Sequence, residues 1–313
     1  MGGPEPVAGV AGPGPAGSGP AGLGPAVSGS RYAGAVGLFI LGAITQYVGA
    51  ALAVGLFQVM PAPTMAWWRI AIAALVLLAW RRPWRSVRGR EAWGAAALFG
   101  VVLALMNVAF YIAIDHIPLG TAVSIEFVGP VTVAALAGSG WAQRAAIAFA
   151  AGGVLTISGF GVDWGEPGTA LGLGSALAAG ALWGLYVVLG KRLSGRVNGL
   201  DALAVGMAAG ALVVAPVVAT TAGAALAEPR VFALVVGVAL LSSVVPYALD
   251  QVNFGVLPAA TFAILLALLP ATSLVVGAVM LRQAPSAGEV VGLGLVSVAV
   301  VLANLPAPRT FGP

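Results

Sequence analysis

One acidic residue, Glu126, stands within a mostly apolar stretch, residues 117–130, that ends in Pro130. An ionised acid at the centre of a membrane helix costs roughly 2.5–3.5 kcal/mol, so such residues usually face a cavity or a partner. Proline has no N–H, and the carbonyl that it leaves without a donor, four residues back, belongs to Glu126 itself. This turn predicts a polar site that binds a substrate amine, couples to protons or does both. The alternative is a structural acid that holds helices together.

A second charged residue, Arg69, lies inside another apolar stretch. Counted from the expected outer ends of their helices, Arg69 and Glu126 lie at depths that match within about 5 Å, at 1.5 Å per residue. Two interpretations stay open. The two side chains form an ion pair across a cavity, or the side chain of Arg69 extends to the outer lipid headgroups.

Uncharged polar and aromatic residues are candidates to complete the site. Asn107 and Tyr111 are four residues apart and share a helix face, with interhelical hydrogen bonds as the alternative role. Trp183 lies near mid-span, away from the interface where tryptophans gather, which favours an aromatic wall. The predicted substrate- or proton-binding residues are Glu126, Arg69, Asn107, Tyr111, Thr121, Ser124, Gln46, Trp183 and Tyr186. The predicted gating or kink residues are Pro130, Pro270, Tyr247 and Asp250, with solvated helix ends as the alternative for the last two.

The composition requires a membrane to surround these residues. Hydrophobic residues make up 60% of the 313 residues and charged residues 8%, whereas soluble domains contain about 25% charged residues. The chain has no cysteine and one histidine, which excludes disulfides and thiolate sites and makes a metal site unexpected. No phosphate-binding loop motif occurs, so we expect no coupling to ATP. The basic residues lie between the apolar runs, where they set topology, so we expect no nucleic-acid partner. The segments between the runs are too short to form a soluble domain, so we expect no enzymatic activity and no cofactor. The expected partners are a small-molecule substrate and the lipid bilayer.

Ten apolar runs are long enough to span a bilayer of about 30 Å. They cover residues 33–57, 64–80, 92–114, 118–138, 142–161, 170–190, 200–221, 230–249, 258–281 and 286–305. If the N-terminus is cytoplasmic, eleven Lys and Arg residues fall on the inside and two on the outside. Such a bias predicts a multi-pass protein of the inner (plasma) membrane with both termini in the cytoplasm.

A motif in the first half recurs in the second. The segment Ile117-Pro-Leu-Gly-Thr-Ala returns 140 residues later as Leu257-Pro-Ala-Ala-Thr-Phe, and Pro130 corresponds to Pro270 at the same spacing. Five spans separate the copies, an odd number, so the second enters the membrane from the opposite side. The expected fold is all-α, with ten transmembrane helices in two five-helix inverted-topology repeats. The expected regions are a disordered Gly/Pro-rich tail (1–32), repeats at 33–161 and 170–305, a linker (162–169) and a C-terminal tail (306–313).

The sequence resembles the drug/metabolite transporter superfamily, specifically its EamA-type members and, among these, the bacterial threonine/homoserine exporter group. The residues that carry the resemblance are Asn107-Val-Ala-Phe-Tyr111, Ile117 to Pro130, Val245-Pro-Tyr-Ala-Leu-Asp250 and Leu257-Pro. The resemblance implies a ten-helix secondary carrier with a central cavity. Two positions depart from the family pattern: Leu269 stands where an acid is usual, and Leu281-Arg-Gln283 stands where Leu-Gly-Glu is usual.

The expected function is secondary transport by alternating access that exports an amino acid or a similar small metabolite, with proton coupling through Glu126 as a hypothesis. Two alternatives remain. One is a drug or other metabolite carrier of the same fold, and the other is a non-transporting membrane partner protein. An anionic substrate would require more cavity Lys or Arg than Arg69 alone, and a scaffold would require a structured soluble extension that the Gly/Pro-rich tail does not resemble.

Overall fold

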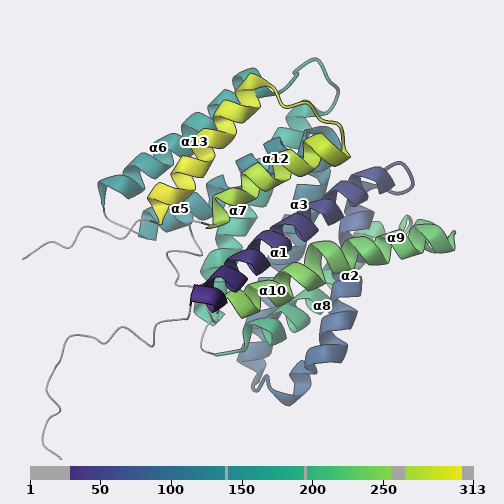
Figure 1. Ribbon diagram of the computed structural model, residues 1–313. Helices are drawn as coiled ribbons and strands as arrows, with labels where there is room; N and C mark the ends of the chain where they lie inside the picture. The colour runs from purple at the N-terminus through teal and green to yellow at the C-terminus, as the bar shows by residue number, and fades with distance from the viewer. Residues whose placement is uncertain (1–28, 138–139, 194–195, 255–264, 305–313) are drawn as a thin grey trace, which may run out of the picture.

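The structure, a computed structural model, describes residues 29–137, 140–193, 196–254 and 265–304; for residues 29–32, 250–252 and 254 it describes the backbone alone. These segments are helices joined by short turns (Figure 1). The α-helices are α1 (Gly29–Leu56), α2 (Ala62–Arg81), α3 (Arg90–His116), α4 (Leu119–Glu126), α5 (Val128–Ala137), α6 (Trp141–Thr156), α7 (Thr169–Leu193), α8 (Gly199–Val218), α9 (Pro229–Ala239), α10 (Val245–Phe254), α12 (Leu268–Met280) and α13 (Ala287–Ala303). Two π-helical turns, η2 (Ile157–Gly161) and η4 (Leu240–Val244), extend α6 and join α9 to α10.

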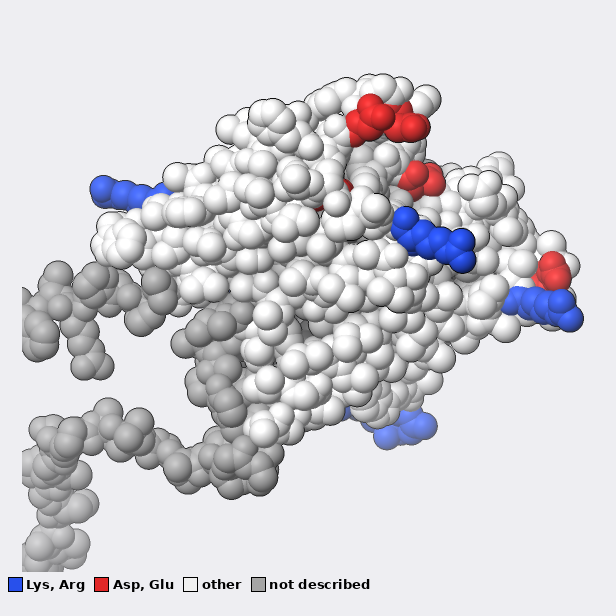
Figure 2. Space-filling model, turned by 45° about the horizontal axis from the view of Figure 1, so that its top comes forward, with Lys and Arg blue, Asp and Glu red and all other residues white. Residues whose placement is uncertain are grey.

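The prediction of an all-helical membrane protein is confirmed at this level. Eight helical stretches in the described residues are long and apolar enough to cross a membrane, and α12 and α13 are shorter apolar helices. Figure 2 shows a face that is mostly uncharged, with the charged side chains restricted to a few places. Large apolar side chains such as Leu75, Leu212 and Val217 are more than half exposed on the outside, as expected of a surface covered by lipid.

The boundaries differ from the expected ones by a few residues. Helix α1 begins at Gly29, inside the expected tail 1–32, and the rest of that tail lies outside the described residues. The ninth expected span, 258–281, is described only from residue 265, and the motif that begins at Leu257 lies outside the described residues.

Two of the expected spans contain a break at corresponding places. The helix of the fourth span stops after Glu126, turns at Phe127 and resumes as α5 at Val128. The ninth span turns in the same way at Ala267 before α12 begins. Each break comes three residues before a proline, which cannot donate the backbone hydrogen bond that would close the turn. The breaks are 140 residues apart, like the two motifs.

Helices from the two halves of the chain pack against one another (Figure 1). Helix α3 packs against α7 and α8, while α9, η4 and α10 pack against α1 and α2. Three further pairs, α2 with α8, α4 with α12 and α6 with α13, join the first half of the chain to the second. The functional site therefore lies between helices that are distant in sequence.

Close packing of α5 against α7 depends on small residues. A Cβ atom at Gly129 would lie 1.7 Å from the carbonyl oxygen of Gly180, and one at Gly180 would lie 2.7 Å from the carbonyl oxygen of Glu126. Only glycine at both positions allows the two backbones to come this close, which is how small residues promote helix association in membranes. This contact fixes the position of Glu126 relative to α7.

Candidate functional site

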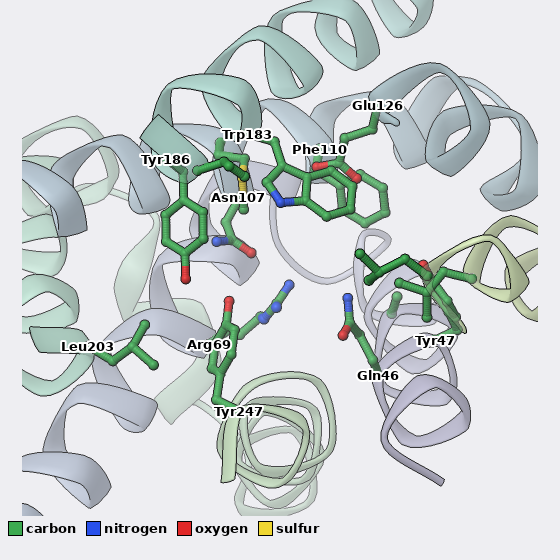
Figure 3. A pocket seen from close by; sticks show the side chains of 15 residues that line it. Gln46, Tyr47, Arg69, Asn107, Phe110, Glu126, Trp183, Tyr186, Leu203 and Tyr247 are labelled. Atoms are coloured by element: carbon green, nitrogen blue, oxygen red, sulfur yellow. The ribbon is translucent and has the colours of Figure 1, made fainter. Parts of the chain in front are cut away.

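A cavity of about 280 Å³ lies between the two halves of the chain (Figure 3). Side chains from α1, α2, α3, α4, α7, α8, α10 and the start of the α12 segment surround it. Its lining residues are Gln46, Tyr47, Ala50, Arg69, Met106, Asn107, Phe110, Glu126, Trp183, Tyr186, Val187, Leu203, Tyr247, Leu266 and Leu269. Seven of the thirteen residues predicted for binding, gating or kinking therefore share this cavity, namely Gln46, Arg69, Asn107, Glu126, Trp183, Tyr186 and Tyr247.

Glu126 is the last residue of α4 and points into the cavity from the break in the fourth span. Its side chain is 8% exposed. Within the described part of the chain, its carboxyl group has no hydrogen bond and no ion pair. A buried carboxyl group without a fixed partner is costly to maintain unless a ligand or a proton satisfies it. Glu126 is thus available to both.

Arg69 lies on α2 and is only 5% exposed, so its side chain does not extend to the lipid headgroups. Its Nε donates to Oγ of Ser243 at 2.7 Å, and its Nη2 donates to the carbonyl oxygen of Ser242 at 2.7 Å. The guanidinium carbon lies 5.4 Å from the centre of the Tyr111 ring, within range of a cation–π interaction. Three contacts therefore hold one cation at the wall of the cavity.

The two charged residues face the same space without touching. The hypothesis of a direct ion pair is not met, because the Arg69 nitrogens and the Glu126 oxygens are farther apart than 4.0 Å. A buried cation and a buried anion each need a partner to offset the cost of leaving water. A gap between them can admit a small ligand that carries both an ammonium and a carboxylate group.

Aromatic and amide groups form the rest of the wall. The ring of Trp183 makes an edge contact with Phe127 at 4.7 Å between centroids, and Tyr186 stacks on Phe99 at 4.4 Å. Figure 3 shows the amide of Gln46 and the hydroxyl ends of the two tyrosines, Tyr186 and Tyr247, directed toward the interior. The Nδ2 group of Asn107 donates a hydrogen bond to the carbonyl oxygen of Leu103, which leaves the side-chain oxygen of Asn107 as an acceptor at the cavity. Such groups orient a ligand without adding charge.

Three of the residues predicted for substrate or proton binding do not line the cavity. Tyr111 is fully buried beneath Arg69, and its hydroxyl has no hydrogen-bond partner among the described atoms. Thr121 donates a hydrogen bond to the carboxylate of Glu289 on α13. Ser124 donates to the carbonyl of Gly120 in its own helix at 2.7 Å. The side chain of Asp250 lies outside the described residues.

The two predicted kink prolines act on the cavity through the residues that precede them. Neither Pro130 nor Pro270 lines it, but the residue four positions before each one does, Glu126 in one half and Leu266 in the other. Leu269, which stands where the related carriers usually have an acid, also lines the cavity. In the described residues the second half thus contributes no acid to this site.

Three further residues of the site were not predicted from the sequence: Ser242 and Ser243, which hold Arg69, and Tyr47, which lines the cavity. A signal for the serines was present. In an α-helix the carbonyl of Ser242 would accept a hydrogen bond from the N–H of residue 246, and residue 246 is a proline. Pro246 leaves the carbonyl of Ser242 without a helical donor, just as Pro130 leaves that of Glu126.

Comparisons with known proteins show which proteins the chain is similar to. Residues 170–305 match the EamA-like transporter family. The chain is 34% identical over 248 residues to the threonine/homoserine exporter RhtA of Escherichia coli (strain K12), covering 79% of this chain and 83% of that protein. It is 33% identical over 245 residues to the threonine/homoserine exporter RhtA of Salmonella typhimurium (strain LT2), covering 78% and 82%.

A solved crystal structure shows the same fold. It covers 87% of this chain and 96% of its own chain with a TM-score of 0.57, at 19% sequence identity.

Proposed function

Because the chain belongs to the EamA-like transporter family, we propose that it is a secondary transporter that exports a small amino acid across the cytoplasmic membrane by alternating access. The observation that carries the proposal is the pair of Glu126 and Arg69, which face one cavity without forming an ion pair. Free amino acids carry an ammonium and a carboxylate close together, so one molecule can satisfy both side chains. The relatives that match most of the chain are exporters of threonine and homoserine.

The size of the cavity favours a small metabolite over a drug. Pockets for drug-sized ligands usually enclose about 300–1,000 Å³. This cavity encloses about 280 Å³ and contains both charges in that space. A drug carrier would be expected to offer a larger and more apolar space around Glu126 and Arg69 than this cavity does.

Two inverted five-helix repeats with ten membrane crossings are part of the proposal. The lining residues themselves support it, because they fall into pairs separated by 140 residues in the sequence. These pairs are Gln46 with Tyr186, Tyr47 with Val187, Asn107 with Tyr247, and Glu126 with Leu266. The breaks at Phe127 and Ala267 and the match of residues 170–305 to the family as a unit also support two repeats.

We place both termini in the cytoplasm on the basis of the distribution of Lys and Arg. The chain has no cysteine, so single cysteines test this cleanly. A cysteine at Arg85 should react with a membrane-impermeant maleimide only after the cells are opened, and a cysteine at Gly165 should react in intact cells. The reverse pattern would contradict the orientation.

Coupling to protons would run through Glu126. Its carboxyl group lies at the cavity and is free of protein hydrogen bonds within the described residues, so it can take up a proton when the substrate ammonium leaves. Glu126→Gln removes the exchangeable proton with little change of shape. Export by this variant should no longer respond to a pH gradient. Efflux by the variant that still follows the gradient at the wild-type rate would rule out the coupling.

Overexpression in bacterial cells tests the function directly. Cells that overexpress the protein should accumulate one or a few amino acids in the medium, and cells that overexpress Glu126→Ala at the same level should not. Equal amino acid release by the two strains would contradict export through this cavity. Leu75→Ala, a change on the outer surface, is the matched control and should behave as the wild type, because Leu75 is 67% exposed.

A further inference from the structure

The segment that joins α9 to α10 is shaped to hold Arg69. Here the helix widens into the π-turn η4, and Ser242 and Ser243 within it are both 1% exposed. Pro246 has no N–H to offer to the carbonyl of Ser242, and that carbonyl accepts a hydrogen bond from Nη2 of Arg69 instead. Widened turns of this kind often occur at functional sites.

The contacts of Arg69 use one edge of its guanidinium group. Nε and Nη2 form that edge, and they donate to Oγ of Ser243 and to the carbonyl of Ser242. An arginine has five N–H donors, and within the described residues the other three have no acceptor. The opposite edge, formed by Nη1 and Nη2, is therefore left for a ligand at the cavity that Arg69 lines.

Among the described residues, no carboxylate is in contact with this cation. The ion pair found in the described residues joins Arg81 to Asp201, and no carboxylate lies within 4.0 Å of Arg69. The groups that hold Arg69 are a hydroxyl, a carbonyl and the face of the Tyr111 ring, all of them uncharged. An arginine fixed in position and left without a counter-ion is suited to bind an anion that comes and goes.

A glycine on α1 makes room for this arrangement. A Cβ atom at Gly49 would lie 2.8 Å from Cβ of Ser242 and 2.9 Å from its backbone nitrogen, closer than real Cβ atoms pack. Any larger residue there would push the π-turn, and with it the two acceptors of Arg69. Gly49 thus supports the turn from behind while its neighbours Tyr47 and Ala50 line the cavity.

We infer that Arg69 binds the carboxylate of the transported amino acid through its free edge, and that Ser242, Ser243 and Pro246 are positioning residues that hold it for this role. The inference rests on the proposed function and deepens it, because it assigns the residue that recognises the substrate carboxylate and the residues that position it. Two parallel N–H groups match the two oxygens of a carboxylate, and Glu126 takes the ammonium at the other side of the gap. The substrates are free α-amino acids, and amides or esters of the same amino acids bind poorly.

The test compares two probes of nearly equal shape, L-threonine and L-threoninamide, for binding to the purified full-length protein. The amide keeps the ammonium and the side chain but has no negative charge. Wild-type protein should bind L-threonine at least about 30-fold more tightly, the effect expected of a charge-assisted bidentate contact. In Arg69→Gln the affinity for the acid should fall to that for the amide, with the amide affinity unchanged.

A paired change at Ser243 tests the positioning role without removing the cation. Ser243→Ala should lower the affinity for L-threonine about 3- to 10-fold, whereas Ser243→Thr, which keeps the hydroxyl, should restore most of it. Neither change should alter the affinity for L-threoninamide. Ser124→Ala is the control, because that hydroxyl bonds within its own helix. All variants should elute and unfold like the wild type.

Equal wild-type affinity for the acid and the amide would overturn the inference, and so would an equal loss of both probes in Arg69→Gln with the fold intact. Either result leaves the proposed export function in place, since an amino acid can still bind through Glu126. A failure of the proposed function looks different: the wild-type protein would bind neither probe and release no amino acid from cells.

Discussion

The breaks at Phe127 and Ala267 have similar backbone conformations, but the residues before them, Glu126 and Leu266, differ in side-chain chemistry. Each interrupts a helix 140 residues from the other, and each places the residue before it, Glu126 or Leu266, at the cavity. One of these residues is a carboxylic acid and the other is an alkyl side chain. Each break thus exposes one residue to the cavity, and the type of that residue decides what the break can bind.

The same difference extends along the cavity wall. Gln46 and Asn107 of the first half correspond to Tyr186 and Tyr247 of the second, so amides in one half face tyrosines in the other. Both charges of the lining, Glu126 and Arg69, also belong to the first half. A ligand with two charged groups therefore has one preferred orientation, with its side chain toward the aromatic wall.

Of the changes considered, a substitution at the first break should have the largest effect on export. Glu126→Gln removes the charge that holds the substrate ammonium, a contact worth about 1.5–3 kcal/mol, and should lower the rate of export at low substrate concentration about 100-fold. Leu266→Gln at the corresponding position should change it less than about 3-fold. Uptake of labelled amino acid into inverted vesicles measures the rates of both variants. Equal losses of rate in the two variants would show that the two breaks do not differ in function.

A second comparison concerns the helix pairs that carry these breaks. Gly180 of α7 corresponds to Ile40 of α1, 140 residues earlier. Gly180→Ala should destabilise the protein by about 1–3 kcal/mol, because the new Cβ would lie 2.7 Å from the carbonyl oxygen of Glu126. Ile40→Ala should cost less than about 1 kcal/mol, since Ile40 is 41% exposed to lipid that is as apolar as its side chain. The thermal unfolding midpoints of the two variants in detergent would show which contact matters.

The aromatic wall should contribute a smaller effect. Trp183→Leu removes the aromatic ring that lines the cavity and would contact the substrate side chain, an interaction worth about 0.5–1.5 kcal/mol, and should raise KM about 2- to 10-fold with kcat little changed. Trp183→Phe retains a ring and serves as the control. A KM equal to that of the wild type in Trp183→Leu would mean that the substrate side chain lies elsewhere.

The smallest effect is expected at Ser124. The sequence predicts this residue for the site, but its hydroxyl bonds to the carbonyl of Gly120 in the same helix. Ser124→Ala should change transport less than about 2-fold, because only a bond within one helix turn is lost. A loss of more than 10-fold would show that Ser124 faces the substrate in another conformation of the carrier.

The membrane-spanning pattern and Glu126 could be predicted from the sequence because both are local signals. Apolar runs of about 20 residues define helices, and an acid next to a proline within such a run is conspicuous. The partners of these residues could not be predicted. Arg69 and Ser243 are 174 residues apart, and Thr121 and Glu289 are 168 apart. Contacts between the two halves follow from how the helices pack, which no local periodicity encodes.

Thr121 illustrates this limit. Its spacing from Ser124 suggested a polar stripe toward the cavity, yet its hydroxyl binds the carboxylate of Glu289, which also accepts the backbone N–H of Ser286 at 2.8 Å at the start of α13. A polar residue in a membrane helix has two common uses, binding a ligand and joining helices, and the sequence does not distinguish between them.

Binding of L-threonine to the purified protein tests most directly whether Glu126 and Arg69 hold the two ends of one small ligand. Equilibrium dialysis with labelled L-threonine would compare the wild type with Glu126→Gln, Arg69→Gln and the double variant. We predict one molecule bound per wild-type chain, weaker binding in each single variant and none detectable in the double variant. Binding by the double variant with wild-type affinity, in a protein that unfolds at the wild-type temperature, would contradict the account.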